Sequence, residues 1–394
     1  MSVVSQPEVV TLGCRLNIAE SEAIRQLAGA GVAVVNGCGV TNQAMRDTRA
    51  AVRRLRRRLP HAELVVTGCA AEMDRAAFAA MPEVDRLVPN AAKLLPGSWG
   101  SARANAPRPR AQTRAFVGVQ NGCDHACTFC AIPQGRGASR SDSIAAIVPR
   151  VAALVEAGQR EVVLSGVDLA SYDDRGMGLA ALVERLLAGV PGLERVRLSS
   201  LDPHVIDDAL FALLTQEPRV MPHVHLSLQA GDDLVLKRMR RRHRRAEALA
   251  LIERLRAARP EMAIGADLIA GFPTEDEAMF ANTLAIVEQA DITHAHVFPY
   301  SPRAGTPAAR MPQVEPEVAR ARAATLRAAS AARLARRLAR QVGTVQRVLV
   351  ERPGDRGHAP DFSEVRLAAP LPLGSVHDVA IVAAAPDHLT GTIA

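Results

Sequence analysis

The fold of this 394-residue chain is decided by one short stretch, Gly122-Cys123-Asp124-His125-Ala126-Cys127-Thr128-Phe129-Cys130. Its three cysteines have the spacing CxxxCxxC and closely follow a predicted strand at residues 116–120. A structural zinc site normally closes with four protein ligands, whereas a cubane iron–sulfur cluster held by three thiolates keeps one iron open for a substrate. The stretch therefore predicts a cluster with an open iron. Zinc with His125 as a further ligand is the alternative.

The other three cysteines, Cys14, Cys38 and Cys69, are far apart in the sequence but share one context. Each follows a glycine at the end of an apolar stretch, at residues 9–12, 32–35 and 64–67, and helical patterns at residues 17–30 and 41–59 lie between. This βαβαβ rhythm predicts a doubly wound parallel sheet, with Thr41 as a helix N-cap. Because open α/β sheets bind ligands at the carboxyl edge of their strands, we expect the three thiols to form a second cluster site there. Three inert, buried cysteines are the alternative.

The rest of the chain predicts two further domains. Six strand candidates, at residues 116–120, 161–165, 195–199, 224–228, 263–269 and 294–298, alternate with helical intervals and indicate a partial barrel of about six α/β units. A basic helix is expected at residues 312–340, and short strands at 345–350, 362–367, 375–384 and 389–393 predict a small antiparallel β-barrel. The polar, proline-bearing residues 101–113 are typical of a linker. We therefore expect domains at residues 8–107, 109–340 and 341–394.

Composition narrows the classes of protein that the chain can be. No apolar run approaches the roughly 20 residues that span a membrane, and residues 1–10 lack the pattern of a secretory signal. We therefore expect a cytoplasmic protein with no membrane partner, and a cytoplasm keeps thiols reduced, which disfavours disulfides. The formal net charge of +7 permits a polyanionic partner.

The position of the CxxxCxxC loop suggests what the open iron binds. The loop follows the first strand of the predicted barrel, at the carboxyl edge where barrel active sites lie. The open iron could chelate the amino and carboxylate groups of S-adenosylmethionine (SAM), and an electron passed to the sulfonium would release a 5′-deoxyadenosyl radical. In such chemistry the protein supplies binding and orientation.

Several segments together resemble the methylthiotransferase family of radical SAM enzymes over essentially the full length, and its threonylcarbamoyladenosine branch most of all. Besides the two sets of three cysteines, the resemblance rests on segments at residues 13–17, 34–41, 67–70, 119–125, 164–169, 199–203, 226–231, 265–275 and 300–303. It departs at Gly37, where the family usually has Thr before the second cysteine. The family implies an N-terminal methylthiotransferase domain, a radical SAM barrel and a C-terminal TRAM domain.

The resemblance also implies an activity, cofactors and partners. The activity is insertion of a methylthio group at C2 of N6-threonylcarbamoyladenosine at position 37 of tRNA, next to the anticodon. The cofactors are SAM and two 4Fe-4S clusters, one on Cys123, Cys127 and Cys130 and an auxiliary one on Cys14, Cys38 and Cys69. The partners are the tRNA anticodon stem-loop, an electron donor and a sulfur source. Residues at strand ends would line the SAM pocket, with ordinary strand-end structure as the alternative for each: Ser165, Asp168, Ser227, Gln229, Asp267, Gly271 and Glu275.

Rival functions share most of these features. An isopentenyladenosine tRNA methylthiotransferase or a ribosomal-protein methylthiotransferase would carry the same clusters, and a redox-sensing RNA-binding protein would use clusters without catalysis. We favour the threonylcarbamoyl substrate because its carboxylate suits an arginine, and candidates near the predicted barrel edges are Arg136, Arg140, Arg197 and Arg303. The basic run at residues 237–245 is a candidate contact for RNA phosphates or a solvated helix face. Aromatic residues for base stacking make up only 3% of the chain.

Overall fold

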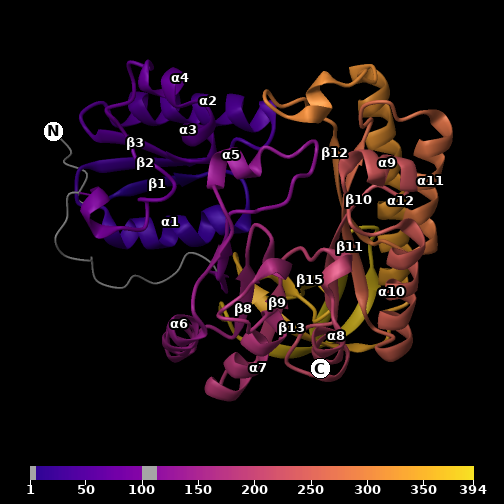
Figure 1. Cartoon of the computed structure of the whole chain (residues 1–394). Coiled ribbons are helices and arrows are strands. Elements are labelled where there is room, and N and C mark those ends of the chain that lie inside the picture. Colours follow the sequence, from indigo (N-terminus) through magenta and orange to yellow (C-terminus); the bar gives the residue numbers. More distant parts are fainter. Residues whose placement is uncertain (1–5, 100–112) are drawn as a thin grey trace.

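The computed structural model describes residues 6–99 and 113–394, so the predicted linker lies almost wholly outside the described residues. The elements form three assemblies (Figure 1): an N-terminal parallel sheet, a central partial barrel of two adjoining sheets, and a closed C-terminal β-barrel. None of the helices in the described part is long and apolar enough to cross a membrane.

The N-terminal sheet is parallel, with helices on both faces. Its strands run in the order β1 (Glu8–Thr11), β2 (Val32–Gly37), β3 (Glu63–Gly68) and β4 (Arg86–Leu87). One face packs on α1 (Arg15–Leu27), and the other packs on α2 (Asn42–Arg58), α3 (Cys69–Met73) and α4 (Arg75–Ala79). Thr41 caps α2 as predicted, since its hydroxyl accepts a hydrogen bond of 3.1 Å from the amide of Ala44. The apolar strands are buried on both faces, which is why they lack a period-two pattern.

The central strands form two three-stranded parallel sheets that adjoin. The strands are β5 (Arg114–Gly118), β8 (Glu161–Ser165) and β9 (Arg195–Leu198), then β10 (His223–Gln229), β11 (Ala263–Ala270) and β12 (His294–Pro299). Parallel bridges from Val196 to Val220 and from Leu201 to Leu226 join the two sheets into a partial barrel, as predicted. Helix α1 of the N-terminal domain contacts β5 at the edge of this barrel.

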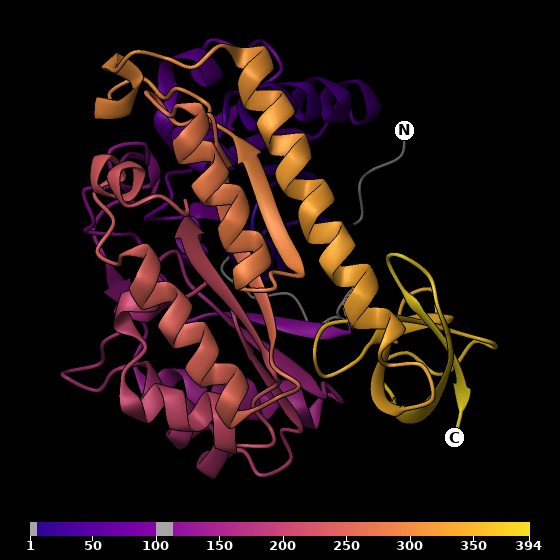
Figure 2. The same cartoon turned by 90° about the vertical axis from the view of Figure 1, so that its right-hand side faces the viewer.

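Helices cover the outside of the central strands and bury one large apolar core against them. They are α6 (Ile144–Glu156), α7 (Leu179–Gly189), α8 (Asp208–Gln216), α10 (Arg245–Ala258), α11 (Glu277–Gln289) and α12 (Pro316–Ala339). Helix α9 (Asp233–Met239) follows β10 and packs into a separate apolar cluster with Phe272 and Ala308. Helix α12 packs along β12 and leads into the C-terminal domain (Figure 2).

The C-terminal domain is a closed barrel in the order β13-β14-β15-β17-β16. Its strands are β13 (Val345–Glu351), β14 (Arg356–His358), β15 (Glu364–Leu367), β16 (Val376–Ala384) and β17 (Leu389–Ile393). Strand β14 was not predicted, because Arg-Gly-His has no alternating apolar residues. The barrel is also not wholly antiparallel, since β15 and β17 are parallel. A closed ring of five strands cannot alternate direction throughout, so at least one neighbouring pair must be parallel.

Candidate functional site

The structure brings Cys14, Cys38 and Cys69 together at the carboxyl edge of the N-terminal sheet. Cys14 precedes α1, Cys38 follows β2, and Cys69 begins α3 directly after β3. The approach is close: a Cβ atom on Gly13 would lie only 2.9 Å from the Sγ of Cys38. Burial, with Cys69 and Cys14 nearby, raises the pKa of Cys38 to about 11. Thiols of this kind must lose protons when a metal or cluster binds.

The CxxxCxxC loop is closed on itself and presents its sulfurs to backbone donors. Short strands β6 (Gln120–Asn121) and β7 (Arg140–Ser141) flank it, α5 (Ile132–Arg136) ends it, and the amide of Cys123 donates to the carbonyl of Gly137 at 3.1 Å. The amides of His125 and Ile132 donate to the Sγ atoms of Cys123 and Cys130, each at 3.4 Å. Such donors favour thiolates. Burial nevertheless raises the pKa of the free Cys130 thiol to about 12.

Phe129 anchors this loop to the barrel. Its ring packs edge-on against Phe272, which follows β11, with ring centroids 6.4 Å apart. His125 is held by Asp168, with 2.7 Å between Nε2 and a carboxylate oxygen. Cys123, His125 and Asp168 lie close enough to hold a metal ion together, but that set would leave Cys127 and Cys130 unused. The loop geometry therefore favours a site made by the three cysteines.

Arg241 lies at the same site, although the sequence pattern did not single it out. Its guanidinium is 3.7 Å from the Sγ of Cys127, and it donates to the carbonyl of Ser227 at 2.8 Å and to Asp202 at 3.1 Å. Asp202 is buried and holds the side chain in place. A guanidinium beside a cluster suits a carboxylate ligand. The only signal in the sequence was its place in a basic run, which gave no reason to separate it from its neighbours.

The predicted SAM-binding residues lie in three places. Ser165, Asp168, Ser227 and Gln229 lie at the carboxyl ends of β8 and β10 or just beyond them, on the side of the cysteine loop. Asp267 of β11 contacts two histidines, with distances of 3.1 Å to His225 and 3.3 Å to His296. Burial would raise the pKa of Asp267, but these hydrogen bonds outweigh it and lower the pKa well below its usual range.

Gly271 and Glu275 face helix α12. A Cβ atom on Gly271 would be inside van der Waals contact distance of Ala319. The carboxylate of Glu275 accepts a 3.1 Å hydrogen bond from the amide of Gly271 and pairs with Arg322 at 2.9 Å. The glycine thus permits close approach of helix α12 at this point.

Arg136 connects the two cysteine sets. It belongs to α5, which follows the loop of Cys123, Cys127 and Cys130 (the proximal cysteines), and its Nε donates to the Sγ of Cys69 at 3.2 Å. It also pairs with Glu20 at 2.9 Å, and Glu20 pairs with Lys93 at 2.5 Å. These three charged side chains are nearly inaccessible, with 4%, 3% and 0% exposure for Arg136, Glu20 and Lys93. The two cations and one carboxylate leave a net positive charge beside Cys14, Cys38 and Cys69 (the distal cysteines), which suits an anionic group bound there.

The arginines proposed to bind a carboxylate lie in different places. Arg197 pairs with Glu161 at 2.8 Å and donates to carbonyls of the C-terminal domain, at the opposite end of the barrel, so that expectation was wrong. Arg136 is occupied by Glu20, and Arg140 by backbone carbonyls. Arg303 donates to Asn42 at 2.7 Å, across the junction with the N-terminal domain.

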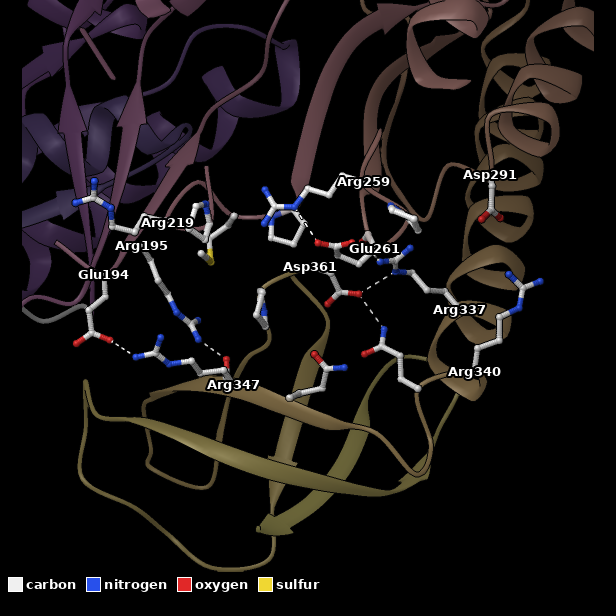
Figure 3. Close-up of a pocket in the computed structure, with 17 residues that line it drawn as sticks. Glu194, Arg195, Arg219, Arg259, Glu261, Asp291, Arg337, Arg340, Arg347 and Asp361 are labelled. Carbon is white, nitrogen blue, oxygen red and sulfur yellow. Dashed lines mark hydrogen bonds and ion pairs between the residues drawn. The ribbon is translucent and has the colours of Figure 1, made fainter. Parts of the chain in front are cut away.

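One pocket lies away from both cysteine sets. It has a volume of about 690 Å³ and is bounded by the amino-terminal ends of the central strands and the C-terminal barrel (Figure 3). Its charges are largely paired, as in Arg347 with Glu194 at 2.7 Å and Arg337 with Asp361 at 2.8 Å. We therefore interpret this pocket as a polar interface between the central and C-terminal domains, and we assign the candidate active site to the cysteines.

Comparisons with known proteins agree with this placement. Residues 117–287 match the Radical SAM superfamily, and residues 7–89 match Uncharacterized protein family UPF0004. The chain is 42% identical to a protein of Rickettsia prowazekii named threonylcarbamoyladenosine tRNA methylthiotransferase MtaB, over 95% of this chain and 94% of that protein. It is 34% identical to a tRNA-2-methylthio-N(6)-dimethylallyladenosine synthase of Erythrobacter litoralis, over 98% and 96%.

A solved structure shows a related fold. The radical S-adenosylmethionine methyltransferase TsrM from Kitasatospora setae superposes with a TM-score of 0.53 at 16% identity, over 75% of this chain and 66% of that one. The two family matches span both cysteine sets of this chain, and the alignment with the Rickettsia prowazekii protein covers 95% of it. The chain therefore belongs to the methylthiotransferase family of radical SAM enzymes and is MtaB-like.

Proposed function

We propose that this protein is a tRNA methylthiotransferase that adds a methylthio group to C2 of N6-threonylcarbamoyladenosine at position 37, by radical SAM chemistry. The observation that carries the proposal is the 42% identity to a protein named for this substrate, along nearly the whole of both chains. The dimethylallyladenosine substrate is the second candidate, supported by a relative at 34% identity.

The radical SAM superfamily implies SAM and one 4Fe-4S cluster. We assign Cys123, Cys127 and Cys130 to that cluster, because they share one loop in which backbone amides donate to the sulfurs of Cys123 and Cys130. When bound, the cluster and SAM would supply the radical that breaks the unactivated C2–H bond. Arg241, Ser165, Asp168, Ser227, Gln229 and Asp267 are our candidates for binding and orienting SAM, while Gly271 and Glu275 shape the end of β11 against α12.

We assign a second, auxiliary cluster to Cys14, Cys38 and Cys69. An oxidised cubane with three thiolates is a net anion. Its fit to this place is supported by Arg136 and Lys93, two buried cations that share the single carboxylate of Glu20. A buried charge without a partner is costly, so an anion at the cysteines would complete the balance of charge.

The wider organisation is part of the proposal. We divide the chain at residues 8–107, 109–340 and 341–394, the last as a TRAM-like domain, although the first boundary falls outside the described residues. The tRNA anticodon stem-loop would approach the carboxyl edge of the barrel, where Cys123, Cys127 and Cys130 lie and where Arg136 contacts Cys69 of the N-terminal sheet. An electron donor and a sulfur source complete the reaction.

The cluster assignment is tested by matched cysteine variants. Anaerobically reconstituted protein should bind about eight irons. Replacing Cys14, Cys38 and Cys69 with Ala, or replacing Cys123, Cys127 and Cys130 with Ala, should each leave about four. The distal variant should still cleave SAM reductively but form no methylthio product, whereas the proximal variant should do neither. Zinc in place of iron, or no SAM cleavage in the distal variant, would contradict the assignment.

The substrate is tested with two tRNAs that differ only at position 37. The enzyme should convert the threonylcarbamoyl form, with the product identified by mass spectrometry of the digested nucleosides, and should leave the isopentenyl form unchanged. The reverse result would establish the second candidate.

A further inference from the structure

One side chain links the loop of the proximal cysteines to the distal cysteines. Helix α5 begins two residues after Cys130, and its last residue, Arg136, reaches Cys69 of the N-terminal domain. Gly135 allows this approach, since a Cβ atom there would lie 3.3 Å from the Cβ of Cys69. The carbonyl of Gly135 also accepts a hydrogen bond from Asn90 of the N-terminal domain. The two cysteine sets are therefore in contact through α5.

The guanidinium of Arg136 has little freedom. One terminal nitrogen donates to Glu20 at 2.9 Å and to Asn121 at 3.0 Å, and the other donates to Asn17. The remaining donor, Nε, points at the Sγ of Cys69. With only 4% of Arg136 exposed, water screens the charge poorly, and its effect on a neighbouring group is larger than at a surface.

The charges around Arg136 do not cancel. Lys93 is a second buried cation, and among the residues that the structure describes Glu20 is the only carboxylate that pairs with either of them. Burial lowers the pKa of Lys93, but Glu20 opposes this. For Arg136, the carboxylate of Glu20 and the sulfurs of Cys69 and Cys14 outweigh burial and raise the pKa. One positive charge is thus left over beside Cys69.

We propose that Arg136 sets the reduction potential of the auxiliary cluster. Reduction adds negative charge to a cluster, so a fixed cation and an N–H···S hydrogen bond stabilise the reduced form more than the oxidised form and raise the potential. Glu20 acts in the opposite sense, because it neutralises part of the positive charge. Arg136 is a positioning residue that adjusts this potential. Because it lies at the end of α5, its position beside Cys69 depends on the loop that holds Cys123, Cys127 and Cys130. The inference rests on the proposed assignment of Cys14, Cys38 and Cys69.

The test is a redox titration followed by electron paramagnetic resonance. The full-length chain with Cys123, Cys127 and Cys130 replaced by Ala isolates the auxiliary cluster. In this background Arg136→Met removes the charge and the hydrogen bond, Arg136→Lys keeps the charge but not the fork of donors, and Glu20→Gln removes the opposing charge. Arg57→Met is the matched control, because it removes an exposed cation from α2 of the same domain.

We expect shifts of opposite sign. Arg136→Met should make the midpoint potential more negative, Arg136→Lys should do so by less, Glu20→Gln should make it more positive, and the control should match the parent. General damage to the site would not give opposite signs. If Arg136→Met and Glu20→Gln shift the potential in the same direction, or neither moves it, the inference is wrong. If Arg136→Met fails to retain about four irons, the other two variants decide the question: Arg136→Lys should still shift the potential to more negative values and Glu20→Gln to more positive values.

A failure of the underlying assignment looks different. If the parent with the proximal cysteines replaced binds no iron and shows no cluster signal, there is no auxiliary cluster, and both the assignment and the inference are overturned. If it binds about four irons but its potential does not respond to Arg136 or Glu20, the assignment stands and only the role of Arg136 is refuted.

Discussion

Gly37 shows how a single residue fits its setting. The family resemblance led us to expect Thr before Cys38, and here the space of such a side chain is taken by Thr48 of α2: a Cβ atom on Gly37 would collide with the Thr48 methyl group. The Thr48 hydroxyl donates to the carbonyl of Cys38 at 3.1 Å, so it supports the turn that carries the cysteine. The departure from the family pattern is therefore accommodated by a neighbour.

The close contact between Gly37 and Thr48 predicts that a larger residue at position 37 destabilises the protein, and that a smaller residue at position 48 restores part of the stability. Gly37→Thr should lower the free energy of unfolding by about 1–3 kcal/mol, because the site is already filled. Thr48→Ala in the same chain should recover part of the loss by clearing the space. Chemical denaturation of the metal-free protein measures both. Gly29→Thr is the control, since nothing lies within 4 Å of the added Cβ atom there. Equal stability of Gly37→Thr and the control would contradict the explanation.

At the scale of elements, the basic run at residues 237–245 is divided by the turn between α9 and α10. Arg241 and His243 turn inward toward Asp202, and Arg245 bonds to the carbonyl of Asn282 at 2.8 Å. Lys237, Arg240 and Arg244 remain exposed. A single helix over residues 237–245 would have placed several of these basic side chains on one face. The turn between α9 and α10 directs them to different surroundings instead.

The division predicts separable effects on SAM and on tRNA. Lys237→Gln, Arg240→Asn and Arg244→Ser together respect the helix, the left-handed conformation at 240 and the cap position, and should weaken tRNA binding. If all three contact phosphates, the slope of log affinity against log salt should fall by about 2–3. Arg241→Gln should leave the slope intact and slow reductive SAM cleavage instead. An unchanged slope in the triple variant would assign these residues to an ordinary solvated surface.

What could be predicted from the sequence depends on how far apart in the chain the interacting residues lie. The N-terminal strands that end at Gly-Cys, and all six central strands, could be predicted because apolar runs and turn residues are signals within a short stretch of sequence. The contacts of Arg136 with Cys69 and of Arg241 with Cys127 were not, because each joins positions 67 and 114 residues apart. Arginine is frequent throughout the chain, so residue type alone did not mark these two.

At the scale of the whole molecule, the C-terminal barrel closes the end of the central barrel that lies opposite the cysteines. Phe362 stacks on His223 with centroids 5.0 Å apart and meets His294 edge-on at 5.8 Å. Arg195 and Arg197 donate to carbonyls of the C-terminal domain. The junction contains His223, which is buried, and His294 and His358, which are half-buried, so the attachment of this domain should depend on pH.

His294 gives this dependence a direction. Burial, helped by Arg337, His225 and His358 and opposed by Asp361, lowers the pKa of His294 from 6.5 to about 4. The unfolded chain therefore binds more protons between these values, and stability present above pH 6.5 is lost as the pH falls toward 4. The contribution of this group is about 3 kcal/mol. His294→Gln should flatten the fall in melting temperature of the metal-free protein between pH 6.5 and pH 4. The exposed His61→Gln variant is the control, and if both variants lose stability as steeply as the parent protein, another group controls the acid stability of the junction.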